Sequence, residues 1–182
     1  MLQRRKLLGL GLGALGASLA APAVSWASLS TTAPRHVALS NLHTGETLEA
    51  VYFDNGSFVP DAVAALNKVL RDYRTGDVHP IDLRLFDTLS AIREKTGSRA
   101  KFEVISGYRS PATNAQLSAR SGEVAKHSLH MDGMAMDIRL SDVALDRLRN
   151  AALDLGRGGV GYYPESRFVH VDVGRVRRWQ GA

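Results

Sequence analysis

The sequence predicts one α+β domain. The chain has 182 residues, 45% of them hydrophobic, enough for a single core of ordinary size after a targeting segment is removed. Segments with the two-residue period of strands are interspersed with segments of helical period, and no repeat or internal linker divides them. The composition therefore excludes a disordered or fibrous protein.

The first 27 residues are predicted to form an export signal. Arg4, Arg5 and Lys6 precede an uncharged stretch rich in Leu, Gly and Ala, and Ser25-Trp26-Ala27 resembles a cleavage site. Adjacent arginines are typical of a twin-arginine signal, although an ordinary secretory leader also fits. We expect residues 28–182 to form a periplasmic domain without a membrane span.

Charge and cysteine content exclude several classes of protein. Lys and Arg total 23 and Asp and Glu total 18, but three basic residues lie in the leader, which leaves 20 against 18. A domain so close to neutral gives no support for a nucleic-acid partner. The absence of cysteine excludes disulfides, zinc–thiolate sites and thiol nucleophiles, so a metal site must use His, Asp or Glu.

Turn signals and periodicity predict the elements in order. Residues 36–53 form a predicted hairpin around the turn at 43–46, a helix runs from Asp61 to Gly76, and a second helix ends at Gly97. The following elements are a strand at 102–105, a helix at 111–120 closed by Gly122, a strand at 134–140, a helix at 143–155 with Ser141 as its cap and Gly156 as its stop, and strands at 160–163 and 168–173.

Polar residues of the second half can converge on one point. His130 lies in a loop that turns at Gly133, and Asp137 follows in a strand whose alternation directs its carboxylate away from the apolar face. In the last strand, the same alternation places His170 and Asp172 on one face.

Two imidazoles and one carboxylate, with a fourth position open to water, form a common catalytic zinc site. His130, Asp137 and His170 fit this set, which can also hold other divalent ions. Spacing alone equally allows an ordinary loop histidine, an Asp137 paired with Arg139 and a strand histidine hydrogen-bonded in a groove.

Three ordered motifs carry a family resemblance. They are Ser106-Gly107-Tyr108-Arg109-Ser110, then Ser128-x-His130-x-x-Gly133-x-Ala135-x-Asp137, then His170-x-Asp172. They resemble the motifs of the zinc D-Ala-D-Ala metallopeptidase family, which shares its fold with the Hedgehog signalling domain and lysostaphin-type enzymes. The resemblance covers about residues 102–179 and implies a small, mainly antiparallel sheet flanked by helices, with zinc on one face. Its branch of exported single-domain bacterial proteins includes murein endopeptidases with a twin-arginine leader.

The resemblance also implies roles for individual residues. One zinc ion per chain would be bound by His130, Asp137 and His170, with Arg109 in a substrate-binding position and Ser128 beside the substrate. A fixed guanidinium is suited to bind a carboxylate or carbonyl. The alternative roles are a turn arginine in a salt bridge for Arg109 and a helix or turn cap for Ser128.

The sequence departs from the family at the general base. Members place a Glu or Asp three residues before the last zinc histidine, or a His two before it, whereas this chain has Arg167 and Phe168, neither of which can act as a base. Asp172 is our first candidate for the base, and it fits equally well as a residue that orients His170. Glu165, on the approach to the strand, is the second candidate.

Three other positions have open roles. Asn114 stands where some members have Gln and could contact substrate or lie on a helix surface. His127 could hydrogen-bond substrate or be an exposed loop histidine. The segment 175–179, with three arginines and a tryptophan, could meet an anionic wall polymer or be a solvated terminal charge run.

The sequence thus predicts a monomeric zinc metallopeptidase that hydrolyses the peptide cross-links or stems of peptidoglycan in cell wall biogenesis or degradation. The resemblance favours an endopeptidase over a carboxypeptidase and leaves open whether the cut bond is D,D or L,D. The alternative is a non-catalytic, zinc-stabilised module that binds cell wall or a partner protein, a use of the fold that the Hedgehog domain illustrates.

Overall fold

The computed structural model describes residues 33–120 and 125–181, so the predicted export signal and Gly122 lie outside the described residues. The strands are β1 (Arg35–Asn41), β2 (Thr47–Asp54), β3 (Ser57–Phe58), β4 (Phe102–Ser106), β5 (Ala135–Arg139), β6 (Gly159–Tyr163), β7 (Phe168–Asp172) and β8 (Arg177–Gln180). The helices are α1 (Pro60–Val69), α2 (Leu83–Thr96), α3 (Pro111–Arg120), the 3₁₀ helix η1 (Leu129–Asp132) and α4 (Leu145–Leu155).

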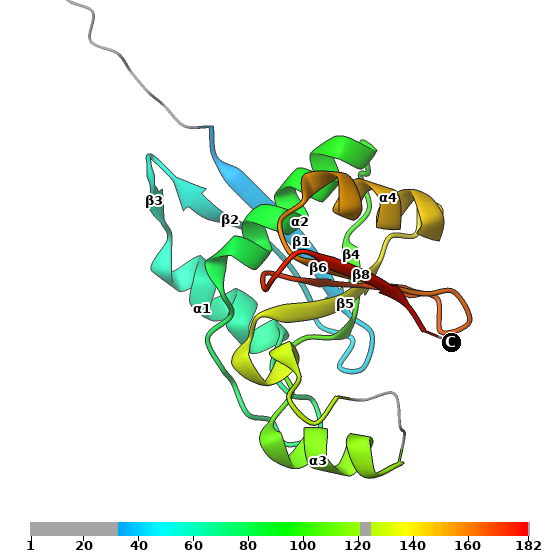
Figure 1. Ribbon diagram of the computed structural model, residues 1–182. Coiled ribbons are helices and arrows are strands. Elements are labelled where there is room, and N and C mark those ends of the chain that lie inside the picture. Colours follow the sequence, from blue (N-terminus) through cyan, green and yellow to red (C-terminus); the bar gives the residue numbers. More distant parts are fainter. Residues whose placement is uncertain (1–32, 121–124, 182) are drawn as a thin grey trace, which may run out of the picture. The chain divides into compact units, whose positions relative to one another are not determined.

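The strands of this part of the chain form one sheet in the order β3-β2-β1-β4-β5-β7-β6-β8 (Figure 1). The pairs β1–β4 and β6–β8 are parallel, and the other neighbouring pairs are antiparallel. The predicted α+β class and mainly antiparallel sheet are therefore confirmed. The sheet is larger than the small one we expected because β3 and β8, which the sequence analysis missed, extend its two edges.

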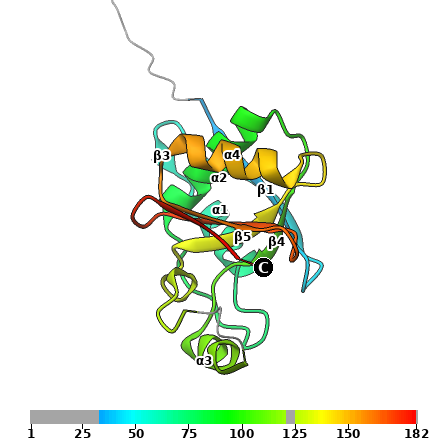
Figure 2. The same cartoon turned by 45° about the vertical axis from the view of Figure 1, so that its right-hand side comes forward.

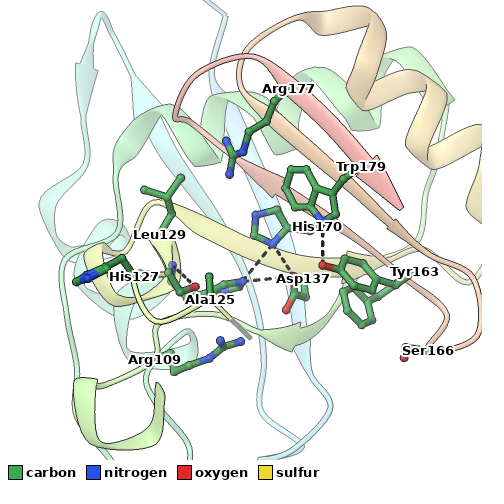
Figure 3. A pocket seen from close by; sticks show the side chains of 13 residues that line it. Arg109, Ala125, His127, Leu129, Asp137, Tyr163, Ser166, His170, Arg177 and Trp179 are labelled. Atoms are coloured by element: carbon green, nitrogen blue, oxygen red, sulfur yellow. Dashed lines mark hydrogen bonds and ion pairs between the residues drawn. The ribbon is translucent and has the colours of Figure 1, made fainter. Parts of the chain in front are cut away.

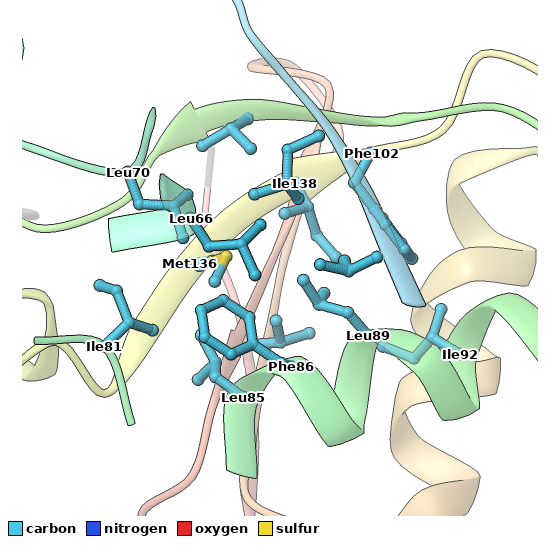
Figure 4. Packing of buried hydrophobic residues seen from close by; sticks show 14 of the residues in the cluster. Leu66, Leu70, Ile81, Leu85, Phe86, Leu89, Ile92, Phe102, Met136 and Ile138 are labelled. Atoms are coloured by element: carbon cyan, nitrogen blue, oxygen red, sulfur yellow. The ribbon is translucent and has the colours of Figure 1, made fainter. Parts of the chain in front are cut away.

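The hydrophobic core lies between the sheet and the helices α1, α2 and α4. Figures 1 and 2 show that α3 lies at a distance from these three helices. Met136 and Ile138 of β5 and Val169 and Val171 of β7 are almost fully buried in this core. Figure 4 shows Met136 and Ile138 packed among side chains of α1 and α2. Because side chains alternate along a strand, the polar residues between these positions lie on the opposite face of the sheet, as predicted.

Most predicted elements are confirmed within a residue or two. The hairpin forms with β1 and β2 on either side of its turn, and α2 ends at Gly97, whose φ of 67° is the left-handed conformation that favours glycine. Asp82 caps the start of α2 by accepting a hydrogen bond from the backbone N–H of Arg84. None of the described helices has the length and apolar character needed to cross a membrane.

The first helix is shorter than predicted, because α1 ends at Val69 instead of continuing to Gly76. Tertiary hydrogen bonds engage its last carbonyl groups: the Asn41 amide donates to the oxygen of Val69 at 2.8 Å, and the backbone N–H of Tyr108 donates to that of Leu70 at 2.8 Å. These contacts with β1 and with the segment after β4 replace the bonds that another helical turn would make.

The last helix begins later than predicted, at Leu145, and Ser141 does not cap it. The reason lies at Asp142, whose carboxylate accepts hydrogen bonds from the Ser98 hydroxyl at 2.6 Å and the backbone N–H of Arg99 at 2.9 Å. These bonds hold the chain before α4 against the connection between α2 and β4, so the helix starts only after that contact.

The third difference concerns the C-terminal segment. Residues 177–180 form strand β8, which pairs in parallel with β6, and Arg177 forms an ion pair with the buried Asp172. A solvated charge run is therefore wrong for Arg177. The sequence pattern did not predict this strand, because Arg177 is held by a carboxylate on a different strand, Asp172 of β7.

Two glycines in the same backbone conformation provide a test of packing next to η1. Gly133 (φ 65°) and Gly97 (φ 67°) both end helices, but an added Cβ at Gly133 would overlap the carbonyl oxygen of Pro80, whereas Gly97 faces open space. We expect Gly97→Ala to lower the free energy of unfolding by about 1 kcal/mol, the cost of the left-handed conformation. Gly133→Ala must also displace backbone and should cost about 3 kcal/mol.

Urea denaturation of the metal-free protein measures both changes. Equal losses in the two variants would contradict the proposed overlap with Pro80.

Candidate metal centre and active site

Strand register brings two of the predicted ligands together. Asp137 of β5 and His170 of β7 are directly paired in the antiparallel ladder, with both side chains on the face away from the core. His130 arrives from η1, which Ser128 caps and Gly133 ends, and its Nδ1–H donates to the carbonyl oxygen of Gly107 at 2.8 Å. This bond directs Nε2 of His130 toward the other two residues.

The three predicted ligands form a compact, buried triad, of which Figure 3 labels Asp137 and His170. His170 Nδ1 lies 2.9 Å from Asp137 Oδ1, and His130 Nε2 lies 3.2 Å from His170 Nδ1 and 3.4 Å from Asp137 Oδ1. Ligand atoms about 2.0–2.1 Å from a tetrahedral zinc ion are about 3.3 Å from one another. The triad therefore already has the spacing of three tetrahedral corners, and its two nitrogens and one oxygen suit Zn²⁺.

The charges of the triad support metal binding. Burial by itself would raise the pKa of the Asp137 carboxyl, but the imidazoles of His130 and His170 hold it well below its usual range. Burial lowers the pKa of His170, yet its hydrogen bonds to Asp137 and Asp172 outweigh burial and raise the pKa to about 9. The ionised carboxylate is ready to bind a cation, whereas His170 must first lose a proton.

Asp172 lies on the other side of the His170 ring from the triad. Its side chain is 0% exposed, and Oδ2 lies 3.2 Å from His170 Nε2. The backbone N–H groups of Gly159 and Gly174 each donate to Oδ1 at 2.9 Å, and Arg177 donates to both oxygens. These hydrogen bonds outweigh the effect of burial and hold the pKa of Asp172 well below its usual range. Both of its oxygens are thus engaged, and Asp172 itself does not line the pocket.

Glu165, the second candidate for the base, is exposed in the turn between β6 and β7. Its neighbour Ser166 lines the pocket around the triad, but Glu165 itself does not. Arg139, which spacing allowed as a partner of Asp137, instead pairs with Glu103 of β4.

Arg109 lines the pocket, and the buried side chain of Asn114 accepts a hydrogen bond from it. The Arg109 guanidinium donates to the Asn114 side-chain oxygen at 3.3 Å and the Ser106 hydroxyl at 3.4 Å. Asn114 is 2% exposed and donates to the carbonyl oxygens of Ala125 and Lys126 at 3.1 and 3.0 Å. Within residues 33–120 and 125–181, Arg109 forms no ion pair with a carboxylate, so its guanidinium can bind an anionic group of a ligand.

The pocket has a volume of about 450 Å³ and two unlike walls. The polar wall includes Arg109, Ser128 and His127, which is exposed and whose ring extends away from the triad in Figure 3. The facing wall is aromatic, with Tyr163 stacked on Phe168 at 4.4 Å and its hydroxyl accepting a 2.9 Å hydrogen bond from Trp179.

Phe168 and Trp179 line the pocket but were not predicted to do so from the sequence. The alternation of β7 could have identified Phe168, which shares a face with His170, whereas nothing in the sequence places Trp179 beside that histidine.

Comparison with known proteins identifies the class to which this fold and site belong. The peptidase family Peptidase_M15_2, described as "Peptidoglycan L,D-endopeptidase MepK", matches residues 29–179, and the chain belongs to this family. The resemblance to peptidoglycan-hydrolysing metallopeptidases is thereby confirmed.

Individual relatives match over nearly their whole length. "Peptidoglycan L,D-endopeptidase MepK" of Escherichia coli K12 is 48% identical over 176 residues, which cover 97% of this chain and 96% of that protein. "Probable peptidoglycan L,D-endopeptidase MepK" of Haemophilus influenzae is 43% identical over 179 residues, 98% of this chain and 96% of the relative. No solved structure matches the chain.

The raised pKa of His170 makes metal binding a proton-release reaction. With a pKa of about 9, the ring is protonated at pH 7.5 in the metal-free protein, and coordination requires its neutral form. We expect Zn²⁺ binding at pH 7.5 to release about one proton from this group and to weaken as the pH falls below 9.

Isothermal titration calorimetry in two buffers of different ionisation enthalpy measures the protons released. His170→Ala should lose both binding and release, and His127→Ala, a pocket histidine outside the triad, should keep both. Tight binding by the wild-type protein without proton release would contradict the assignment.

Proposed function

We propose that this protein is a periplasmic, Zn²⁺-dependent L,D-endopeptidase that cuts peptide cross-links of peptidoglycan. The observation that carries the proposal is the ligand-spaced triad in the pocket of a chain that matches relatives of that name along nearly its full length. The proposal includes cleavage of the leader after Ala27, a monomeric protein, and the fold of the Hedgehog and D-Ala-D-Ala peptidase group.

The residues that would hold the ion are His130 through Nε2, Asp137 through Oδ1 and His170 through Nδ1. When bound, Zn²⁺ polarises a carbonyl oxygen and lowers the pKa of water to about 7, so that a proton can leave near neutral pH. Burial of the triad strengthens these electrostatic interactions because the surroundings have a low dielectric constant.

Arg109 would position the substrate. Its guanidinium lies on the polar wall of the pocket and can donate two parallel hydrogen bonds to a carboxylate or carbonyl of the peptide stem. We propose that Ser128 lies beside the bound peptide and that Asn114 holds Arg109 in place. The side-chain NH₂ group of Asn114 donates both of its hydrogen bonds to backbone carbonyl oxygens, which fixes the orientation of the amide. The aromatic wall would pack against the stem on the opposite side.

The geometry favours a positioning role for Asp172 over a role as general base. Its oxygens accept hydrogen bonds from two backbone N–H groups and from Arg177, and it does not line the pocket. Glu165 is exposed and does not line the pocket, which argues against a direct role of its carboxylate in the reaction.

The test is digestion of purified muropeptide dimers by the zinc-loaded protein, with products identified by mass spectrometry. We expect L,D-cross-linked dimers to become monomers and D,D-cross-linked dimers to remain intact. His170→Ala should abolish cleavage, and Glu165→Gln should leave the rate within about twofold because surface changes away from the pocket have small effects.

Two outcomes would overturn the proposal. Cleavage of D,D cross-links alone would refute the L,D assignment. Retention on insoluble peptidoglycan without release of any peptide would support the non-catalytic binding module instead.

A further inference from the structure

The C-terminal strand β8 reaches the metal centre through one side chain. Arg177, its first residue, donates from its two terminal nitrogens to the two oxygens of Asp172 at 3.1 and 2.7 Å. Asp172 Oδ2 in turn lies 3.2 Å from His170 Nε2, and Nδ1 of the same ring belongs to the triad. A continuous series of contacts therefore leads from the edge of the sheet to a metal ligand.

The position of Asp172 is fixed from every side. Backbone N–H groups of Gly159 and Gly174 donate to Oδ1, and the carboxylate is closed off from solvent. An added Cβ at Gly159 would overlap both the Asp172 carboxylate and the Arg177 guanidinium, so the ion pair needs a residue without a side chain at this position. Because a buried carboxylate is costly without a charged partner, the two hydrogen bonds from Arg177 stabilise Asp172 in this place.

The contact with Asp172 determines which nitrogen of His170 is free. A carboxylate next to Nε2 favours the tautomer that carries its proton there, which leaves the lone pair of Nδ1 to bind a metal. Strand β8 also restrains the ring mechanically, because Trp179 packs against His170 with ring centroids 5.1 Å apart. Figure 3 shows Arg177 and Trp179 on the side of the His170 ring away from Arg109.

We propose that Arg177 is a positioning residue of the metal centre: by holding Asp172, it fixes His170 with Nδ1 toward the ion and thereby sets metal affinity. The inference rests on the metal centre of the proposed function but not on which peptide bond is cleaved. It also assigns a role to β8, since this strand supplies the partner of Asp172, the carboxylate beside the ligand His170 on β7.

The contribution of Arg177 can be measured as the dissociation constant for Zn²⁺, by competition with a chromophoric chelator, in the full chain. Arg177→Ala should weaken binding about 10- to 100-fold, the usual effect of losing the outer partner of a metal ligand, because Asp172 is the partner that Arg177 holds in place. Arg177→Lys keeps the charge but loses the bidentate hydrogen bonds to Asp172, so its affinity for Zn²⁺ should lie between those of the wild type and Arg177→Ala. Asp172→Asn, which preserves shape, should weaken binding to a similar extent.

The matched control is Arg178→Ala, because Arg178 is the next residue of β8, is exposed and forms no hydrogen bond or ion pair with Asp172. We expect its affinity to stay within twofold of the wild-type protein. A second readout follows the ring itself: ¹⁵N NMR of the zinc-loaded protein should show a protonated His170 Nε2 whose hydrogen exchanges faster with water in Arg177→Ala.

Two results would overturn the inference. One is an Arg177→Ala affinity within twofold of wild type, and the other is an equal loss in Arg178→Ala, which would indicate general loosening of the strand. Failure of the metal centre itself is a different outcome, in which the wild-type protein and His130→Ala compete equally poorly with the chelator.

Discussion

The pairing of β5 with β7 is the constraint on which the core and the site both depend. Asp137 lies opposite His170 in this ladder, and Met136 lies opposite Val171 on the core side. Because side chains alternate strictly, a shift of either strand by one residue would turn its ligand into the core and its apolar neighbours toward the pocket. The hydrophobic core thus holds the register, and the register holds two ligands of the metal centre.

A second support comes from the segment that joins β4 to α3. The Gly107 carbonyl orients His130, and Arg109 follows two residues later in the pocket wall. An added Cβ at Gly107 would overlap the end of α1, and the buried Asp72 accepts a hydrogen bond from the backbone N–H of Ser110 at 2.9 Å. The early end of α1, where helical periodicity failed as a guide, is therefore also where the segment that carries Arg109 is anchored.

Local patterns predicted the parts of the site that depend on local geometry. Alternation in two strands was sufficient to place Asp137 and His170 on the face away from the core, and the turn at Gly133 allowed the loop residue His130 to join them. The role of Asp172 could not be decided from sequence, because its partner Arg177 belongs to a strand with no hydrophobic alternation. Asn114 was ambiguous for a similar reason, since its hydrogen-bond partners lie across a tertiary contact.

The central claim is that one ion is held by these three residues with His170 in a single orientation. A crystal structure of the zinc-loaded protein, with anomalous diffraction collected at the zinc absorption edge, tests it most directly. We expect one ion about 2.0–2.2 Å from His130 Nε2, Asp137 Oδ1 and His170 Nδ1. A zinc ion coordinated by His170 Nε2, or one that takes Asp172 as a ligand, would contradict it.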